Sequence, residues 1–313
     1  MDYEKLIDKE TWAFIRKTED YYPPDATVMS IAEQRKTYDT MCRAFFQGYP
    51  NGVSVRDGDA QGVPIRIYEA TAKNEIDAPG SDATVIYYHG GGFVVGGLDS
   101  HDDVCAEICD RTGLRVVSAD YRLCPENPHP AAFEDAWTTL NYVSLTWPGV
   151  TVLVGDSAGG NLAAAVSHHA RGKVPVAGQV LIYPGLGGDM TQGSYMTHAK
   201  APMLSTEEVR FYHSVRHGTS EIHEDPTAAP LTDSNFAGLP RSVIFTAQCD
   251  PLADDGRMYR DRIRAAGGRA HWVEEPGLVH GYLRARSTVP RAKASFDRIL
   301  VAISALSQEN WPF

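Results

Sequence analysis

The sequence lacks the features that mark several large classes of protein. Its 29 Lys and Arg residues are outnumbered by 40 Asp and Glu residues, which leaves a formal net charge of −11. Nucleic acid and anionic membrane surfaces are both bound through an excess of basic side chains, so neither is expected as a partner. No apolar run approaches the roughly 20 residues of a transmembrane helix. The charged start MDYEKLIDKETW has no apolar core like that of a signal peptide. We therefore expect a cytoplasmic protein.

Cysteine and metal-ligand motifs are scarce as well. The five cysteines are scattered and odd in number, so we expect buried thiols and no disulfide framework. His101, Cys105 and Cys109 share one helical face but lack a fourth ligand. His213 and His217 lack the glutamate of the HExxH motif and are expected to be a solvent-exposed pair. We expect no metal and no cofactor.

The pattern from about residue 83 onward is a regular alternation of strands and helices. It predicts strands over 83–90, 114–121, 150–156, 176–185, 241–250 and 269–277. It predicts helices over 101–113, 130–145, 158–171, 255–266 and 290–306. Such alternation is typical of βαβ units, so the fold class is α/β, with a mostly parallel central sheet and helices on both faces. A chain of 313 residues is long enough for one such domain with an insertion.

Two segments depart from this rhythm. The first 50 or so residues are predicted to be mostly helical, with a break at Tyr21-Tyr22-Pro23-Pro24, and residues 53–70 are predicted to form a β-hairpin. Residues 186–225 interrupt the alternation and contain an amphipathic segment, EEVRFYHSVRHG. An excursion of this length is usually functional and often forms a lid.

A serine lies at one junction between strand and helix. In VLVGDSAGGNLAAA, the residues Gly155-Asp156-Ser157-Ala158-Gly159 fit G-x-S-x-G, the nucleophile elbow of α/β hydrolases. Flanking glycines allow the sharp turn that lifts the hydroxyl clear of the sheet, beside the free N–H groups of a helix N-terminus. Taken alone, the motif is equally consistent with a Gly-Ser turn in which Ser157 caps the helix.

A glycine run after an earlier strand makes the catalytic interpretation much stronger. His89-Gly90-Gly91-Gly92-Phe93 follows TVIYY, and an HGGG run there supplies backbone N–H donors for an oxyanion hole. A Walker-type phosphate loop would need Gly-Lys-Ser/Thr, which is absent.

A nucleophilic serine needs a base and an orienting carboxylate, in the chain order Ser, acid, His for this fold. Asp250 ends the strand SVIFTAQCD, and His280 follows the next strand within EEPGLVHGY. Asp254 and Asp255 lie beyond the strand tip and are weaker candidates. The remaining rival histidines are His271, inside a strand, and His168 and His169, which are expected at the surface.

The combined motifs HGGGF, DYRLCPENPHPAAFEDA, GDSAGGNLAAA, YPGL, CDPLADDG and VHGY resemble those of the hormone-sensitive-lipase family of esterases, the bacterial family IV group. The resemblance covers about residues 83–285 and implies carboxylic-ester hydrolysis on an α/β-hydrolase core. It also implies a helical cap made from residues 1–50 and 186–225, with the core in 51–185 and 226–313.

The resemblance further implies a role for individual residues. Ser157 would be the nucleophile, His280 the base and Asp250 its orienter. The oxyanion donors would be the amides of Gly91, Gly92 and Ala158, with His89 and Gly90 supporting the loop. The substrate pocket is expected to include Phe93, Asp156, Tyr183, Tyr195, Phe211, Leu278 and Val279.

Other functions fit the sequence less well. An amide or peptide hydrolase could use the same residues, but a protease would more often carry an additional domain for peptide selection. A ligand receptor on this fold would lack the catalytic histidine, and His280 is present. We expect a small-molecule ester of short acyl chain as substrate, because bulky cap groups can close one end of the cleft; the alternative for most of these groups is simple packing of the cap on the core. A homodimer is left open by the resemblance. The candidate closing groups are Trp12, Tyr21, Tyr22, Tyr195, Phe211 and Tyr212.

Overall fold

One mixed sheet organises the described part of the chain. The computed structural model describes residues 1–23, 26–71, 82–218 and 225–313. Pro24 of the predicted break and residues 219–224 of the predicted excursion lie outside these. Within the described residues the sheet has eight strands in the order β1-β2-β4-β3-β5-β6-β7-β8. The strands are β1 Val53–Ala60, β2 Val63–Ala70, β3 Thr84–Tyr88, β4 Arg115–Ala119, β5 Thr151–Asp156, β6 Gly178–Ile182, β7 Arg241–Cys249 and β8 Ala270–Val279.

Strand direction follows the sequence pattern. The β1–β2 pair is the predicted antiparallel hairpin, and β2 is also antiparallel to β4, whereas every pair from β4 to β8 is parallel. Every residue of β3, β5 and β6 is buried. Continuous apolar strands of this kind are expected where helices cover both faces of a parallel sheet. The predicted α/β class with a mostly parallel sheet is confirmed.

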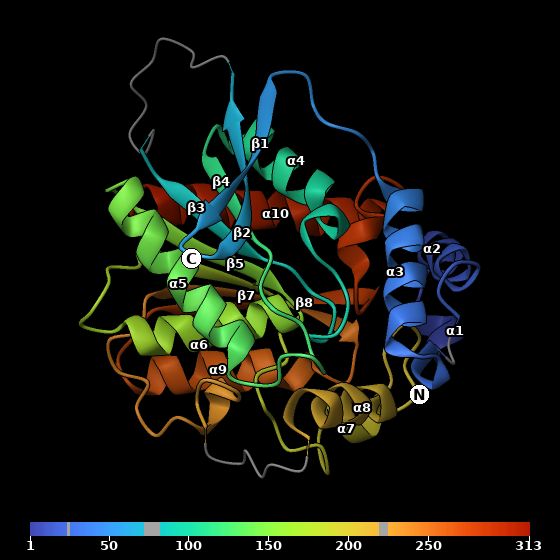
Figure 1. Cartoon of the computed structure of the whole chain (residues 1–313). Coiled ribbons are helices and arrows are strands. Elements are labelled where there is room, and N and C mark those ends of the chain that lie inside the picture. Colours follow the sequence, from blue (N-terminus) through green and yellow to red (C-terminus); the bar gives the residue numbers. More distant parts are fainter. Residues whose placement is uncertain (24–25, 72–81, 219–224) are drawn as a thin grey trace.

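Helices cover both faces of the sheet (Figure 1). α4 and α10 pack together on one face, while α5, α6 and α9 lie on the other. The helices are α1 Tyr3–Leu6, α2 Lys9–Glu19, α3 Ile31–Phe45, α4 Asp102–Thr112, α5 Ala131–Thr146, α6 Ala158–Ala170, α7 Ser194–Thr197, α8 Thr206–His217, α9 Ala253–Ala265 and α10 Pro290–Ser307. All the predicted core helices are present to within a few residues of the expected bounds. No helix in the described ranges has the length and apolar character needed to cross a bilayer.

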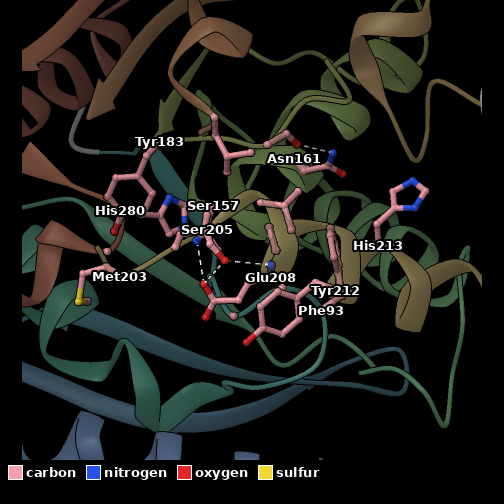
Figure 2. A pocket seen from close by; sticks show the side chains of 18 of the residues that line it. Phe93, Ser157, Asn161, Tyr183, Met203, Ser205, Glu208, Tyr212, His213 and His280 are labelled. Carbon is pink, nitrogen blue, oxygen red and sulfur yellow. Dashed lines mark hydrogen bonds between the residues drawn. The ribbon is translucent and has the colours of Figure 1, made fainter. Parts of the chain in front are cut away.

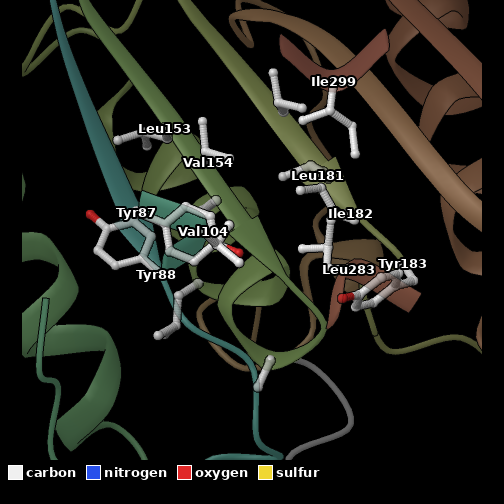
Figure 3. Packing of buried hydrophobic residues seen from close by; sticks show 14 of the residues in the cluster. Tyr87, Tyr88, Val104, Leu153, Val154, Leu181, Ile182, Tyr183, Leu283 and Ile299 are labelled. Carbon is white, nitrogen blue, oxygen red and sulfur yellow. The ribbon is translucent and has the colours of Figure 1, made fainter. Parts of the chain in front are cut away.

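The hydrophobic core lies between the sheet and its helices. Figure 3 shows part of it, with side chains from β3, β5 and β6 and Ile299 of α10. All five cysteines are buried free thiols, as expected. The carboxyl ends of the parallel strands β3, β5, β7 and β8 lie at the same edge of the sheet. Ligand-binding and catalytic sites of open parallel sheets are found at this edge.

The N-terminal helices and the excursion after β6 meet on one side of the sheet (Figure 1). The hydroxyl of Tyr3 in α1 lies 3.2 Å from Nδ1 of His198, which directly follows α7. The hydroxyl of Tyr22 lies 3.2 Å from that of Tyr212 in α8. Two segments far apart in sequence are therefore joined through polar aromatic contacts.

Candidate active site

Ser157 lies on a sharp turn between β5 and α6. Its φ of 53° and ψ of −116° are sparsely populated by residues with a side chain, and its amide donates to the Ile182 carbonyl at 2.9 Å. A Cβ on Gly155 would lie 2.3 Å from the Gly159 carbonyl oxygen, and one on Gly159 would lie 1.8 Å from that of Tyr88. Both glycines are therefore required by close backbone packing. The turn leaves the hydroxyl at the edge of the sheet.

His280 connects Ser157 to a buried carboxylate. Its Nε2 lies 2.8 Å from the Ser157 Oγ, and its Nδ1 lies 2.7 Å from Asp250 Oδ2. Asp250 directly follows β7 and His280 directly follows β8. Since both strands are parallel to β5, their carboxyl ends reach the same edge of the sheet. Asp250 is 1% exposed, and its other oxygen accepts the Leu252 amide at 2.9 Å. The structure thus brings together the hydroxyl, imidazole and carboxylate that the sequence motifs selected.

The two neighbouring aspartates hold other groups. Asp254 accepts the Ser194 amide at 2.8 Å and pairs with Arg257. Asp255 is fully buried, and its Oδ2 accepts the Leu186 amide at 2.7 Å and the Tyr195 hydroxyl at 3.1 Å. Burial raises the pKa of Asp255 to about 6. These carboxylates anchor the segment after β6 to the start of α9, and neither hydrogen-bonds His280 in the described part of the chain.

Two of the remaining histidines are not where the sequence placed them. The prediction of a surface position is wrong for His168 and for His217, which are both buried. His168 faces Asp233, with Nδ1 2.6 Å from Oδ2, and burial lowers its pKa to about 4. The ring of His217 packs against that of His129. Their partners come from loops distant in sequence, so helical spacing alone gave no sign of this burial.

The glycine loop after β3 lies beside the serine turn. Gly91 and Gly92 have φ values of 123° and 61°, and a Cβ on Gly91 would lie 2.1 Å from the Val95 carbonyl oxygen. In the described residues, no acceptor is found for the amides of Gly91, Gly92 and Ala158. Ala158 opens α6, so its N–H also has no partner within the helix. Three backbone donors are therefore available for an acceptor beside Ser157.

Two buried polar residues hold this loop in place. The Nδ1 of His89 lies 2.7 Å from the Gly90 carbonyl oxygen, and the Gly90 amide donates to Asp156 Oδ1 at 2.9 Å. Burial lowers the pKa of His89 to about 4, so its ring is neutral. Burial opposes ionisation of Asp156, but His101 and a hydrogen bond from the Tyr87 hydroxyl outweigh it and lower the pKa of Asp156.

A cavity of about 950 Å³ is lined by Ser157 and His280 (Figure 2). Of the predicted pocket residues, those that line it are Phe93, Asp156, Tyr183 and Tyr195. The expectation fails for Phe211, Leu278 and Val279, which are not among the lining residues. Phe211 packs its ring against Tyr212 instead. Leu278 and Val279 are buried in the core at the end of β8.

Several cavity residues escaped the sequence analysis. Tyr212 covers the glycine loop so closely that a Cβ on Gly92 would lie 2.6 Å from its ring. The sequence named this tyrosine only as a bulky cap group, and the helical pattern did not show which aromatic of α8 faces inward. Asn161, Arg216 and Arg284 also line the cavity, and no motif marks them.

Comparison with known proteins supports the same picture. A family model described as the alpha/beta hydrolase fold matches residues 85–284. The chain is 38% identical over 257 residues to Esterase LipI of Mycobacterium tuberculosis, which covers 79% of each chain. It is 36% identical over 253 residues to Carboxylesterase NlhH of the same species, which covers 77% of each. Its structure is similar to that of an esterase from the bacterial hormone-sensitive lipase family, with a TM-score of 0.85, 26% identity and coverage of 96% of this chain and 99% of the other.

Proposed function

The chain belongs to the alpha/beta hydrolase family and, within it, to the hormone-sensitive-lipase group of esterases, and on this basis we propose that it hydrolyses short-chain carboxylic esters through an acyl-enzyme on Ser157. The chain is a carboxylic-ester hydrolase, as its relatives are. The observation that carries the proposed mechanism is the hydrogen-bonded series from Ser157 through His280 to Asp250.

The proposed reaction begins with proton transfer from the hydroxyl. His280 Nε2 takes the Ser157 proton as the oxygen attacks the ester carbonyl, and the same nitrogen then protonates the departing alcohol. Asp250 accepts from Nδ1–H, which keeps Nε2 free to act as a base and stabilises the imidazolium that forms. A water molecule, activated by His280 in the same way, then releases the acid and restores Ser157.

The negative charge that develops on the carbonyl oxygen needs fixed donors. In this proposal the amides of Gly91, Gly92 and Ala158 supply them, supported by His89 and Gly90. Because Ala158 is the first residue of α6, the helix dipole also favours negative charge there. These donors are part of the backbone, so little reorganisation is needed in the transition state.

The preference for short acyl chains is proposed from the aromatic wall of the cavity. The cap in this proposal comprises residues 1–50 and the described part of 186–225, joined at Tyr22 and Tyr212. Both tyrosines line the cavity, as does Tyr195, whereas Trp12, Tyr21 and Phe211 do not. A wall of this kind limits the acyl length that can be buried.

A covalent probe tests the assignment of Ser157 directly. An alkyl phosphonate ester should inactivate the enzyme and add its mass to the peptide that contains Ser157. In a structure of the adduct, the phosphoryl oxygen should accept from the three proposed amides. Labelling of a different serine, or an oxygen directed away from the glycine loop, would contradict the assignment.

A further inference from the structure

The cavity wall contains a buried cation whose hydrogen bonds within the described residues go only to neutral groups. Arg216, near the end of α8, is 5% exposed and lines the same cavity as Ser157 and His280. Within the described ranges its guanidinium contacts a backbone carbonyl, an amide oxygen and an imidazole, and it forms no ion pair with a carboxylate. A buried charge is costly unless it is paired, and a guanidinium does not escape by losing its proton at neutral pH.

The groups around Arg216 are neutral and hold it loosely. Its Nη1 donates to the Ala228 carbonyl at 3.1 Å, and its Nη2 lies 3.4 Å from Asn161 Oδ1 and 3.5 Å from His129 Nδ1. The guanidinium carbon lies 3.6 Å from the centroid of the Phe93 ring. A guanidinium has five N–H donors, so these contacts leave donors without an acceptor in the described part of the chain. Figure 2 shows Phe93 and Asn161 in the same pocket as Ser157.

The neighbouring imidazoles add no countercharge. Burial lowers the pKa of His217 to about 3, with Arg216 adding to the effect. Burial and Arg216 also lower the pKa of His129, whose Nε2 lies 3.0 Å from Asp225 Oδ2. That carboxylate fixes the proton of His129 on Nε2, which leaves Nδ1 to accept from Arg216. Asp225 is thus separated from the guanidinium by a neutral ring.

Two of the carboxylates that line the cavity, those of Asp156 and Glu208, already have hydrogen-bond partners. Asp156 receives the Gly90 amide and the Tyr87 hydroxyl. Glu208 lies two turns earlier in α8 and accepts from the amide and the hydroxyl of Ser205, both at 2.7 Å. Three Lys and Arg side chains line the cavity in the described part of the chain: Lys200 is exposed, Arg284 is half-buried and donates to the Tyr38 hydroxyl, and Arg216 is buried. Arg216 is therefore the buried cation of this wall that lacks a carboxylate partner, while Asp156 and Glu208 have partners of their own.

From this arrangement, and resting on the proposed esterase function, we infer that Arg216 binds a second, free carboxylate of the substrate, so that the preferred esters carry a negative charge. The carboxylate belongs to the acyl part, as in a half-ester of a dicarboxylic acid, or to the alcohol part, as in an ester of a hydroxy acid. A planar guanidinium with free donors matches a carboxylate in both geometry and charge.

Matched substrate pairs distinguish the two sources. The acyl pair is monoethyl succinate and ethyl pentanoate, and the alcohol pair is O-acetyl-lactate and isopropyl acetate, each followed by acid release in a pH-stat. In one pair the charged ester should have the higher kcat/KM, by about 10- to 100-fold, the size expected for a charge-assisted hydrogen bond. Equal or lower values for the charged member of both pairs would overturn the inference.

Variants then assign the preference to Arg216. Arg216→Gln should abolish it chiefly through a higher KM for the charged ester, while hydrolysis of the neutral ester persists. Arg216→Lys should retain part of it. Arg210→Gln removes an exposed arginine of the same helix and should leave the ratio unchanged. A ratio that survives Arg216→Gln but is lost in Arg284→Gln would transfer the role to the other cavity arginine.

Two further measurements test the role of Arg216 separately from turnover and from the assignment of the nucleophile. Calorimetric titration of Ser157→Ala with monoethyl succinate and O-acetyl-lactate reports binding without turnover, and the favoured ester should bind at least tenfold more weakly when Arg216→Gln is added. If neutral esters are hydrolysed but neither charged ester is preferred, the inference fails and the proposed function stands. If Ser157→Ala still hydrolyses esters while the charged preference remains, the proposed nucleophile fails and the inference stands.

Discussion

The two walls of the cavity are built in different ways. On the sheet side, Gly155 and Gly159 allow backbone contacts that no side chain would fit, and the position of Ser157 follows from them. On the side of the proposed cap, the wall consists of side chains, and its two segments are joined by a hydroxyl contact between Tyr22 and Tyr212. The first wall is fixed by close packing of the backbone, and the second by packing of side chains that a single substitution can change. Reaction chemistry should therefore depend on the sheet side and substrate selection on the cap side.

The largest effect should follow from removing the nucleophile. Ser157→Ala should lower kcat by roughly 10⁴–10⁶, as for other serine nucleophiles held by a histidine. Because alanine lacks the hydroxyl but leaves the backbone unchanged, the thermal unfolding midpoint should stay close to that of the wild type. Steady-state kinetics on a chromogenic acetate ester measure the loss. A variant that retains a tenth of the wild-type rate would show that another group attacks the ester.

The next largest effect should distinguish the role of Asp250 from that of the nearby carboxylate of Asp254. Asp250→Asn should lower kcat by about 10⁴, because the amide cannot hold His280 with Nε2 free to accept a proton. Asp254→Asn is the matched control, since Asp254 lies in the first turn of α9 and bonds Ser194 and Arg257. It should cost far less activity. Equal losses at both positions would mean that the orienting carboxylate is misassigned.

The contrast between the walls also explains what could be predicted from the sequence. Ser157, Asp250 and His280 each follow directly on a strand, so local motifs and the order of the strands were sufficient to predict that these three side chains lie together at one edge of the sheet. Phe211 and Tyr212 are adjacent on α8, and only the packing of that helix decides which ring faces the cavity.

The sequence pattern was also unable to predict contacts between residues that are far apart in the chain. The burial of His168 depends on Asp233, which reaches it from a loop 65 residues later. Leu278 and Val279 precede His280 in the chain, but as residues at the end of β8 they pack into the core. The periodicity of apolar residues predicts which face of a helix or strand is buried, but it does not predict which residues pack against that face.

A smaller effect, on the pH dependence of stability, is expected from Asp255, which anchors the segment after β6 to the start of α9. The pKa of Asp255 is raised from 3.8 to about 6 by burial, so the folded protein binds this proton more tightly than the unfolded chain does. The stability from this group is therefore complete below pH 3.8 and is lost as the pH rises through about 6. Asp255→Asn keeps an oxygen acceptor for the Leu186 amide but has no proton to lose.

The test compares chemical unfolding of the two proteins across this range. Relative to Asp255→Asn, the free energy of unfolding of the wild type should fall by up to about 3 kcal/mol between about pH 4 and pH 7, at 1.36 kcal/mol per pKa unit. His168 and His217, whose pKa values are lowered to about 4 and about 3, act in the opposite direction but equally in both proteins. Parallel curves for the two proteins would contradict a raised pKa for Asp255.

The smallest effect, counted per carbon atom, tests whether the aromatic wall selects the acyl chain. Each buried methylene gains about 0.8 kcal/mol, or about fourfold in kcat/KM, for as long as the cavity has room. Activity on p-nitrophenyl esters should therefore peak at roughly two to six acyl carbons and then fall. Tyr212→Ala removes a ring from the cavity wall and should move the peak to longer chains, whereas Tyr22→Phe removes only a hydroxyl and should leave it in place. The profile is measured on soluble esters and repeated with emulsified triglyceride. A wild-type maximum at long chains, or an unchanged peak in Tyr212→Ala, would show that this wall does not set acyl length, even if both aspartate and serine variants behave as expected.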